Sequence, residues 1–149
     1  MPEYAEHICN GGTALTKKEL SKLYWLNREI EEDKRKLAEL EVAAVSSTAK
    51  ITGLPHVTGA HDKIGNMAIL IAEQRNMIEL KMKQSVIEYN RITRYINSID
   101  DVQMRMILSL RYVNCLNWQQ VAYSVGGNNT ADSVRKAHDR FLKLSVLSD

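Results

Sequence analysis

The sequence predicts an all-α fold in which a long antiparallel helical hairpin, similar to a coiled coil, precedes a small three-helix bundle with a helix-turn-helix. Apolar residues recur at helical spacing over two long stretches, and only two prolines and seven glycines interrupt the 149 residues. Two short helical patterns flank the turn Gly126-Gly127-Asn128-Asn129. We expect a flexible tail over residues 1–15, the self-associating hairpin over 16–97 with a loop at 46–61, and a DNA-binding domain over 98–149.

The first helix is predicted to begin near Thr16, because Thr16 and Glu19 have the spacing of a capping box. Apolar residues then follow in alternating steps of three and four, with Asp33 in the one polar place. This spacing is typical of a heptad seam. We expect the seam to mediate self-association into a homodimer or a higher homo-oligomer. Its members are Leu23, Leu26, Ile30, Leu37 and Leu40.

The second helix is predicted to begin with Asp62 as its N-cap and to carry apolar residues at helical spacing as far as Ile96. Two helices of similar length, joined by one loop, predict an antiparallel hairpin. A shorter helix is then expected from about Ile99 to Val113, with Ser98 and Asp101 at its start. Its expected inward residues are Val102, Met106, Ile107, Leu110 and Tyr112.

The last part of the chain has the signals of a helix-turn-helix. Asn117 and Gln120 have capping-box spacing, and Gly126 can adopt the positive φ that ends a helix. Asn129 or Thr130 is expected to cap the helix that follows. The face of that helix expected to point inward consists of Val134, Ala137, Phe141 and Leu144.

A turn of this kind lets a second helix project into the major groove of DNA, where residues near its start reach base edges. Arg135 is the candidate for a guanine contact, while Lys136 and Arg140 are candidates for phosphate contacts. The alternative is a plain three-helix bundle with a solvated charged face, since residues 130–144 hold only four basic against two acidic side chains. The predicted DNA-binding residues are Asn128, Asn129, Thr130, Asp132, Ser133, Arg135, Lys136 and Arg140.

Composition and motifs narrow the class of protein. The chain is 44% hydrophobic and 26% charged with a net charge of +2, which is ordinary globular composition. No apolar run is long enough for a membrane span, no signal peptide is expected, and Cys9 and Cys115 form no CxxC pair, so we expect a cytoplasmic protein. No phosphate loop, metal-ligand set or catalytic triad spacing is found, so we expect no enzyme, no metal and no cofactor.

The segment TADSVRKAHDRFLKL resembles the recognition helix of region four of bacterial sigma factors, and MRMILSLRYVNCLNWQQVA resembles the part that precedes it. Thr130 corresponds to the capping residue, Asp132 to an acidic position, Val134-Arg135 to a Val-Arg pair and Lys136 to a Gln. Ala131 departs from the pattern, because sigma factors often have an arginine there. The resemblance implies a DNA-reading helix.

Four further segments carry a second resemblance: LTKKELSKLYWLNREIEEDKRKL, STAKITGLPHVTG, YNRITRYINSIDD and GGNNTADSVRKAHDRF. Through them, nearly all of residues 15–145 resembles small phage- and prophage-encoded proteins of Gram-positive bacteria, the ArpU-type transcriptional regulators. This resemblance implies a regulator linked to late genes or to DNA packaging, with a coiled N-terminal part. We expect double-stranded DNA to be its partner. Two alternatives remain open: a DNA-packaging protein similar to a small terminase, and a protein–protein adaptor acting on RNA polymerase.

Overall fold

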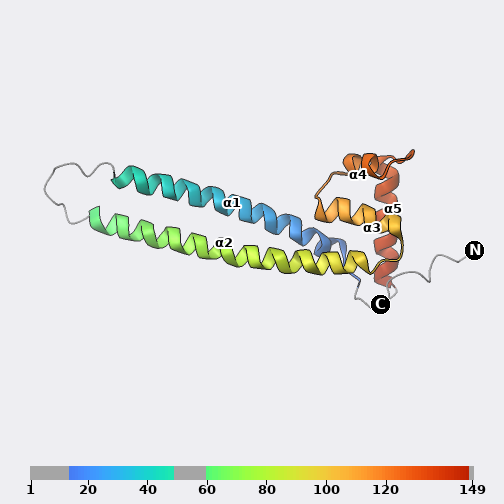
Figure 1. Cartoon of the computed structure of the whole chain (residues 1–149), viewed down its shortest axis with the longest axis horizontal. Coiled ribbons are helices and arrows are strands. Elements are labelled where there is room, and N and C mark those ends of the chain that lie inside the picture. Colours follow the sequence, from blue (N-terminus) through green and yellow to red (C-terminus); the bar gives the residue numbers. More distant parts are fainter. Residues whose placement is uncertain (1–13, 49–59, 148–149) are drawn as a thin grey trace, which may run out of the picture. The chain divides into compact units, whose positions relative to one another are not determined.

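The computed structural model describes residues 14–48 and 60–147, which are helical throughout apart from short connections (Figure 1). The predicted all-α class is confirmed, with two long helices followed by shorter ones. No helix within these two ranges is long and apolar enough to cross a membrane. The elements are α1 (Lys17–Thr48), α2 (Ala60–Asn97), α3 (Val102–Leu108), a π-helical turn η1 (Ser109–Val113), α4 (Trp118–Val125) and α5 (Ala131–Leu147).

The contacts divide the chain into two compact units. The hairpin unit is Leu26–Ser85, and the helix-turn-helix unit comprises the described residues of Met1–Trp25 and Val86–Asp149. This division differs from the predicted boundary at residue 97, because the first turns of α1 and the last turns of α2 belong to the same core as the short helices. Leu20 and Leu23 of α1 and Ile92 and Ile96 of α2 are buried in that core.

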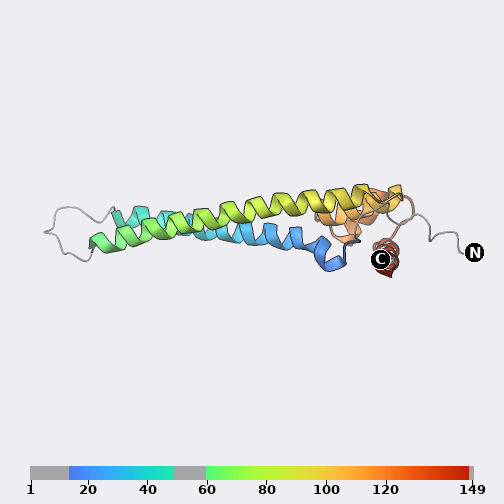
Figure 2. The ribbon, with the colours of Figure 1, turned by 90° about the horizontal axis from the view of Figure 1, so that it is seen from below.

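In the hairpin unit, α1 and α2 run antiparallel and lie side by side in both views (Figures 1 and 2). Three polar pairs between the helices define their register. As the residue number of the partner on α1 rises, that of the partner on α2 falls, as an antiparallel arrangement requires. The Ser85 hydroxyl donates to Asn27 Oδ1 at 2.6 Å, Lys81 pairs with Asp33, and Arg75 pairs with Glu41 at 2.6 Å.

The seam is occupied within the single chain. Leu23, Leu26 and Ile30 are buried, and Leu37 and Leu40 are half-buried. A second copy of the chain would therefore have to contact side chains outside this seam. Self-association stays a prediction. Exposed apolar residues of the hairpin unit are available for such a contact: Val42, Val45, Ile69, Leu70, Met77, Leu80 and Met82.

Asp33, the polar member of the seam, is itself buried. Its carboxylate accepts a hydrogen bond from the Lys81 ammonium, and Gln74 Nε2 donates to its backbone carbonyl at 3.3 Å. The bond from Lys81 lowers the pKa of Asp33 although burial opposes ionisation. A charged residue is tolerated in the seam because α2 supplies the opposite charge at the same level.

The helix-turn-helix unit has one continuous apolar core to which all of its elements contribute. This core includes Leu15 just before α1, Leu20 in α1, Ile107 and Leu108 in α3, and Val121 in α4. Leu15 is thus a core residue, although the sequence analysis placed it in the tail. The start of α1 is fixed by the predicted capping box, since Glu19 N donates to Thr16 Oγ1 at 3.3 Å and Thr16 N donates to Glu19 Oε2 at 2.9 Å.

Three predicted boundaries need correction. The loop predicted over 46–61 is shorter, because α1 continues to Thr48 and α2 already begins at Ala60. Asp62 therefore lies inside α2 and is not its N-cap. The third helix begins at Val102 and not at Ile99, because Asp101 is its N-cap and accepts from Met104 N at 3.1 Å. Residues 1–13 of the predicted tail, residues 49–59 of the predicted loop and residues 148–149 lie outside the described residues.

The inward face of α3 also differs from the prediction. Ile107 and Tyr112 are buried as expected, whereas Val102 and Met106 are exposed and Met104 takes their place in the core. The helix also starts three residues later than predicted, and the π-helical turn η1 follows it before α4.

Candidate nucleic-acid interface

The first helix of the helix-turn-helix is fixed by local signals at both ends. Asn117 Oδ1 accepts from Gln120 N and Gln120 Oε1 accepts from Asn117 N, each at 2.9 Å, so the predicted capping box is confirmed. Gly126 ends α4 with a φ of 74°, and Gly127 follows with a φ of 65°. These backbone angles favour glycine because a Cβ atom would strain them.

The turn and the start of α5 use side chains that were predicted to contact DNA. Asn129 Nδ2 donates to the Gly126 carbonyl at 2.8 Å, which braces the turn. Thr130 is the cap of α5, since Ser133 N donates to Thr130 Oγ1 at 3.1 Å and Thr130 N donates to Ser133 Oγ at 2.9 Å. Asn128 is exposed. Asn129, Thr130 and Ser133 thus shape the start of α5 before any DNA contact.

The outward face of α5 is as predicted, with Asp132, Ser133, Arg135, Lys136 and Arg140 all exposed. Two of its cations share one carboxylate: Asp132 pairs with Arg135 at 2.8 Å and with Lys136 at 2.7 Å. The bonds from Lys136 and then Arg135 lower the pKa of Asp132. These three side chains together carry a single positive charge.

Arg140 and Lys143 continue this face toward the C-terminal end of α5. Both are exposed, and within the described part of the chain neither has a carboxylate at ion-pair distance. Lys136, Arg140 and Lys143 are spaced by four and three residues, so they lie along one side of the helix. Lys136, which also pairs with Asp132, therefore forms a row with Arg140 and Lys143.

The inward face of α5 is rotated from the predicted one. Val134 is buried as expected, and Ala137 and Phe141 pack only partly against the core. Leu144 is 49% exposed, so the prediction that it points inward is wrong. The buried positions are instead Val134, His138, Leu142 and Ser145.

His138 has the most polar surroundings of these buried residues, and the sequence analysis did not single it out. Its side chain is fully buried. Nε2 lies 2.8 Å from the Tyr112 hydroxyl of η1, and Nδ1 lies 2.9 Å from Asp139 Oδ1. The Trp118 indole of α4 meets the imidazole edge to face at 4.9 Å between ring centroids. Burial lowers the pKa of His138 although its bond with Asp139 opposes that change.

The partners of His138 are themselves held in place. Burial raises the pKa of Tyr112 to about 12, so this phenol keeps its proton. The Arg111 guanidinium lies 4.9 Å from the centre of the Trp118 ring and donates to the Leu116 carbonyl at 2.7 Å. Lys17 at the start of α1 pairs with Asp139 at 3.3 Å.

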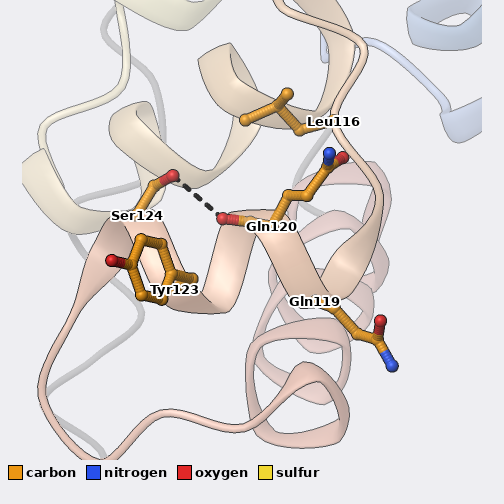
Figure 3. A pocket seen from close by; sticks show the side chains of 5 residues that line it. All are labelled: Leu116, Gln119, Gln120, Tyr123 and Ser124. Atoms are coloured by element: carbon orange, nitrogen blue, oxygen red, sulfur yellow. Dashed lines mark hydrogen bonds between the residues drawn. The ribbon is translucent and has the colours of Figure 1, made fainter.

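A shallow depression of about 450 Å³ lies on α4 and on Leu116, two residues before this helix (Figure 3). It is lined by Leu116, Gln119, Gln120, Tyr123 and Ser124, and the Ser124 hydroxyl donates to the Gln120 carbonyl at 2.9 Å. None of these five side chains is a carboxylate, an imidazole or a thiol. The depression therefore offers hydrogen bonds and an aromatic ring.

The geometry of this unit is a short capped helix, a two-glycine turn and a longer helix with a buried side and a charged side. Comparisons of the chain with family models, with curated proteins and with solved structures found no match.

Proposed function

We propose that this protein is a sequence-specific transcriptional regulator of phage or prophage type that binds double-stranded DNA through α5. The observation that carries the proposal is the division of α5 into two sides. Val134, His138 and Leu142 are buried, while Lys136 and Arg140 are exposed on the other side. This is the arrangement that a recognition helix needs in order to enter a major groove.

The charges on α5 favour selective binding over general attraction to DNA. Arg140 and Lys143 are available for phosphate contacts, whereas Arg135 and Lys136 must share Asp132 until DNA competes for them. The carboxylates of Asp132 and Asp139 also repel phosphate. We therefore expect weak binding to arbitrary duplexes and stronger binding where Arg135 meets a guanine in the right register.

The test is selection of bound duplexes from a random pool, followed by salt titration of binding to the selected sequence. Arg135→Ala should lose preference between sequences, and Arg140→Gln should weaken binding to all sequences and lower the salt slope by about one. Arg28→Ala, an exposed arginine of the hairpin unit, is the control and should bind as the wild type does. If no duplex is enriched, or if all variants bind alike, α5 does not read DNA.

An adaptor that contacts RNA polymerase is a second candidate, because Tyr123 of α4 is 90% exposed beside the depression. An aromatic side chain in such a position is typical of a protein–protein contact. Tyr123→Ser should weaken capture of purified RNA polymerase if the adaptor function is right. Equal capture by wild type and variant would exclude Tyr123 as the contact, and capture by neither would favour DNA binding alone.

Oligomeric state separates the regulator from a packaging protein of the small-terminase kind. A regulator with one helix-turn-helix in each copy is expected to act as a dimer, whereas a packaging protein is expected to form a ring of many copies. Sedimentation of the full chain at micromolar concentration distinguishes the two. A ring would overturn the proposal of a transcriptional regulator.

A further inference from the structure

The environment of His138 joins four elements of the helix-turn-helix unit around one imidazole. Tyr112 of η1 and Asp139 of α5 bind its two nitrogens, Trp118 of α4 packs on its ring, and Lys17 of α1 pairs with the same Asp139 oxygen. These contacts come from residues far apart in the sequence. They meet on the buried side of α5, the helix whose exposed side carries the proposed DNA-contacting residues.

The hydrogen bonds determine which nitrogen carries the proton. The ionised Asp139 carboxylate can only accept, so His138 Nδ1 must donate to it. Asp139 is ionised at neutral pH: burial opposes ionisation, but the bonds from His138 and Lys17 together lower its pKa. In a neutral imidazole the other nitrogen is an acceptor, so Nε2 accepts from the Tyr112 hydroxyl. Both nitrogens and the Tyr112 hydroxyl hydrogen are then satisfied together in the neutral form with the proton on Nδ1.

We propose that His138 is the positioning residue of the DNA-contacting helix: in the neutral form with the proton on Nδ1 it holds α5 against η1 and α4, and its protonation releases α5. Only the consequence for DNA rests on the proposed function. The attachment of α5 by one tautomer is a property of the free protein and can be tested without DNA.

Protonation of His138 breaks the hydrogen-bond arrangement with Tyr112. A protonated Nε2 would have to donate to the Tyr112 oxygen, and the buried Tyr112 hydroxyl would then lose its acceptor. The charged ring would also face the cations Arg111 and Lys17, with only Asp139 on the favourable side. Burial and these cations disfavour the imidazolium, so a proton binds the unfolded chain more readily than the folded one.

The direction of the pH dependence follows. Because the pKa of His138 is lower in the folded protein than its ordinary value of 6.5, its contribution to stability is complete above pH 6.5. The contribution is lost as the pH falls from 6.5 toward the folded pKa. One proton changes the unfolding equilibrium constant by at most about tenfold for each pH unit.

The first measurement is the ring-nitrogen NMR spectrum of the full chain, with labelled histidine and no DNA. We expect His138 to show the proton on Nδ1 at pH 7.5 and to titrate below 6.5. A proton on Nε2, or a midpoint at or above 6.5, would overturn the proposal. This measurement uses the wild type and therefore does not depend on how well a variant folds.

The second measurement is unfolding by urea between pH 5 and 7. His138→Gln should remove the pH dependence, while a variant with His7, His56 and His61 all changed to Gln should keep it. Tyr112→Phe should destabilise the unit, and Tyr89→Phe, which removes an exposed hydroxyl, should not. The idea fails if wild-type unfolding is independent of pH in this range, or if His138→Gln keeps the dependence.

The final arm measures binding to a selected duplex over the same pH range. Wild type should lose affinity as His138 takes up its proton, and the variant lacking the other three histidines should lose it at the same pH. Binding that is strong and unchanged while His138 titrates would overturn the positioning role. If no duplex binds at any pH, the proposed function fails, and the NMR and unfolding measurements still decide the role of His138.

Discussion

Two leucines of α5 provide a direct test of which side of this helix faces the core. Leu142 is 6% exposed and Leu144 is 49% exposed, although they lie two residues apart and the sequence pattern favoured Leu144 as the buried one. Leu→Ala removes the same atoms at both places. At Leu142 the lost burial and the cavity together should lower the free energy of unfolding by about 2–5 kcal/mol. At Leu144 a half-exposed side chain leaves no cavity, and the cost should stay below about 1 kcal/mol.

The difference can be measured by urea unfolding, followed through the fluorescence of Trp118 in a Trp25→Phe background. In thermal unfolding, a loss of 1 kcal/mol in the free energy of unfolding lowers the melting temperature by about 2–4 °C for a chain of this size. The two variants should therefore be clearly distinguished. Equal destabilisation, or a larger loss for Leu144→Ala, would show that α5 presents its other side to the core. The proposed DNA-contacting face would then be wrong as well.

Three further predictions concern charge, pH and assembly. Asp132→Asn should strengthen binding to arbitrary duplexes at low salt, because it frees two cations and removes a negative charge; weaker or equal binding in an anisotropy titration would contradict this. The pKa of Glu19 is lowered to about 2, first by the Thr16 backbone N–H and then by Arg91. The contribution of ionised Glu19 to the stability of the fold is therefore complete above its ordinary pKa of 4.5, and it is lost as the pH falls from 4.5 through 2. Glu19→Gln should remove that part of the acid sensitivity, which urea unfolding at pH 3 and 6 checks. Leu80→Glu should leave the helical content intact and weaken self-association, whereas Leu26→Glu should unfold the hairpin unit; if Leu80→Glu sediments as the wild type does, the exposed face of α2 is not the contact surface.

The features predicted correctly from the sequence are those with a local cause. The capping boxes of Thr16 with Glu19 and of Asn117 with Gln120 depend on residues three apart, and both form as expected. The positive φ of Gly126 follows from the glycine itself. The all-α class follows from apolar spacing over many turns, which no single residue can alter.

The features that the sequence did not reveal depend on contacts between distant residues. Around α5 several choices of inward face contain enough apolar residues, and the buried face includes a histidine whose partner Tyr112 lies 26 residues earlier. A histidine on a helix gives no sign of being buried unless its partners are known. Likewise η1 has no clear local signal, and the burial of Met104 in place of Met106 was not predicted.

The buried pair of Asp33 and Lys81 has a consequence for how the hairpin finds its alignment during folding. Leucines and isoleucines spaced by heptads pack almost equally well if one helix slides by seven residues past the other. Such a slide would carry the buried Asp33 carboxylate away from Lys81 and leave it with only the more distant Lys36 of its own helix, at 3.8 Å, as a counter-charge. Misaligned hairpins should therefore be less stable and short-lived. The Asp33 carboxylate would then select one alignment of the two helices from several similar ones.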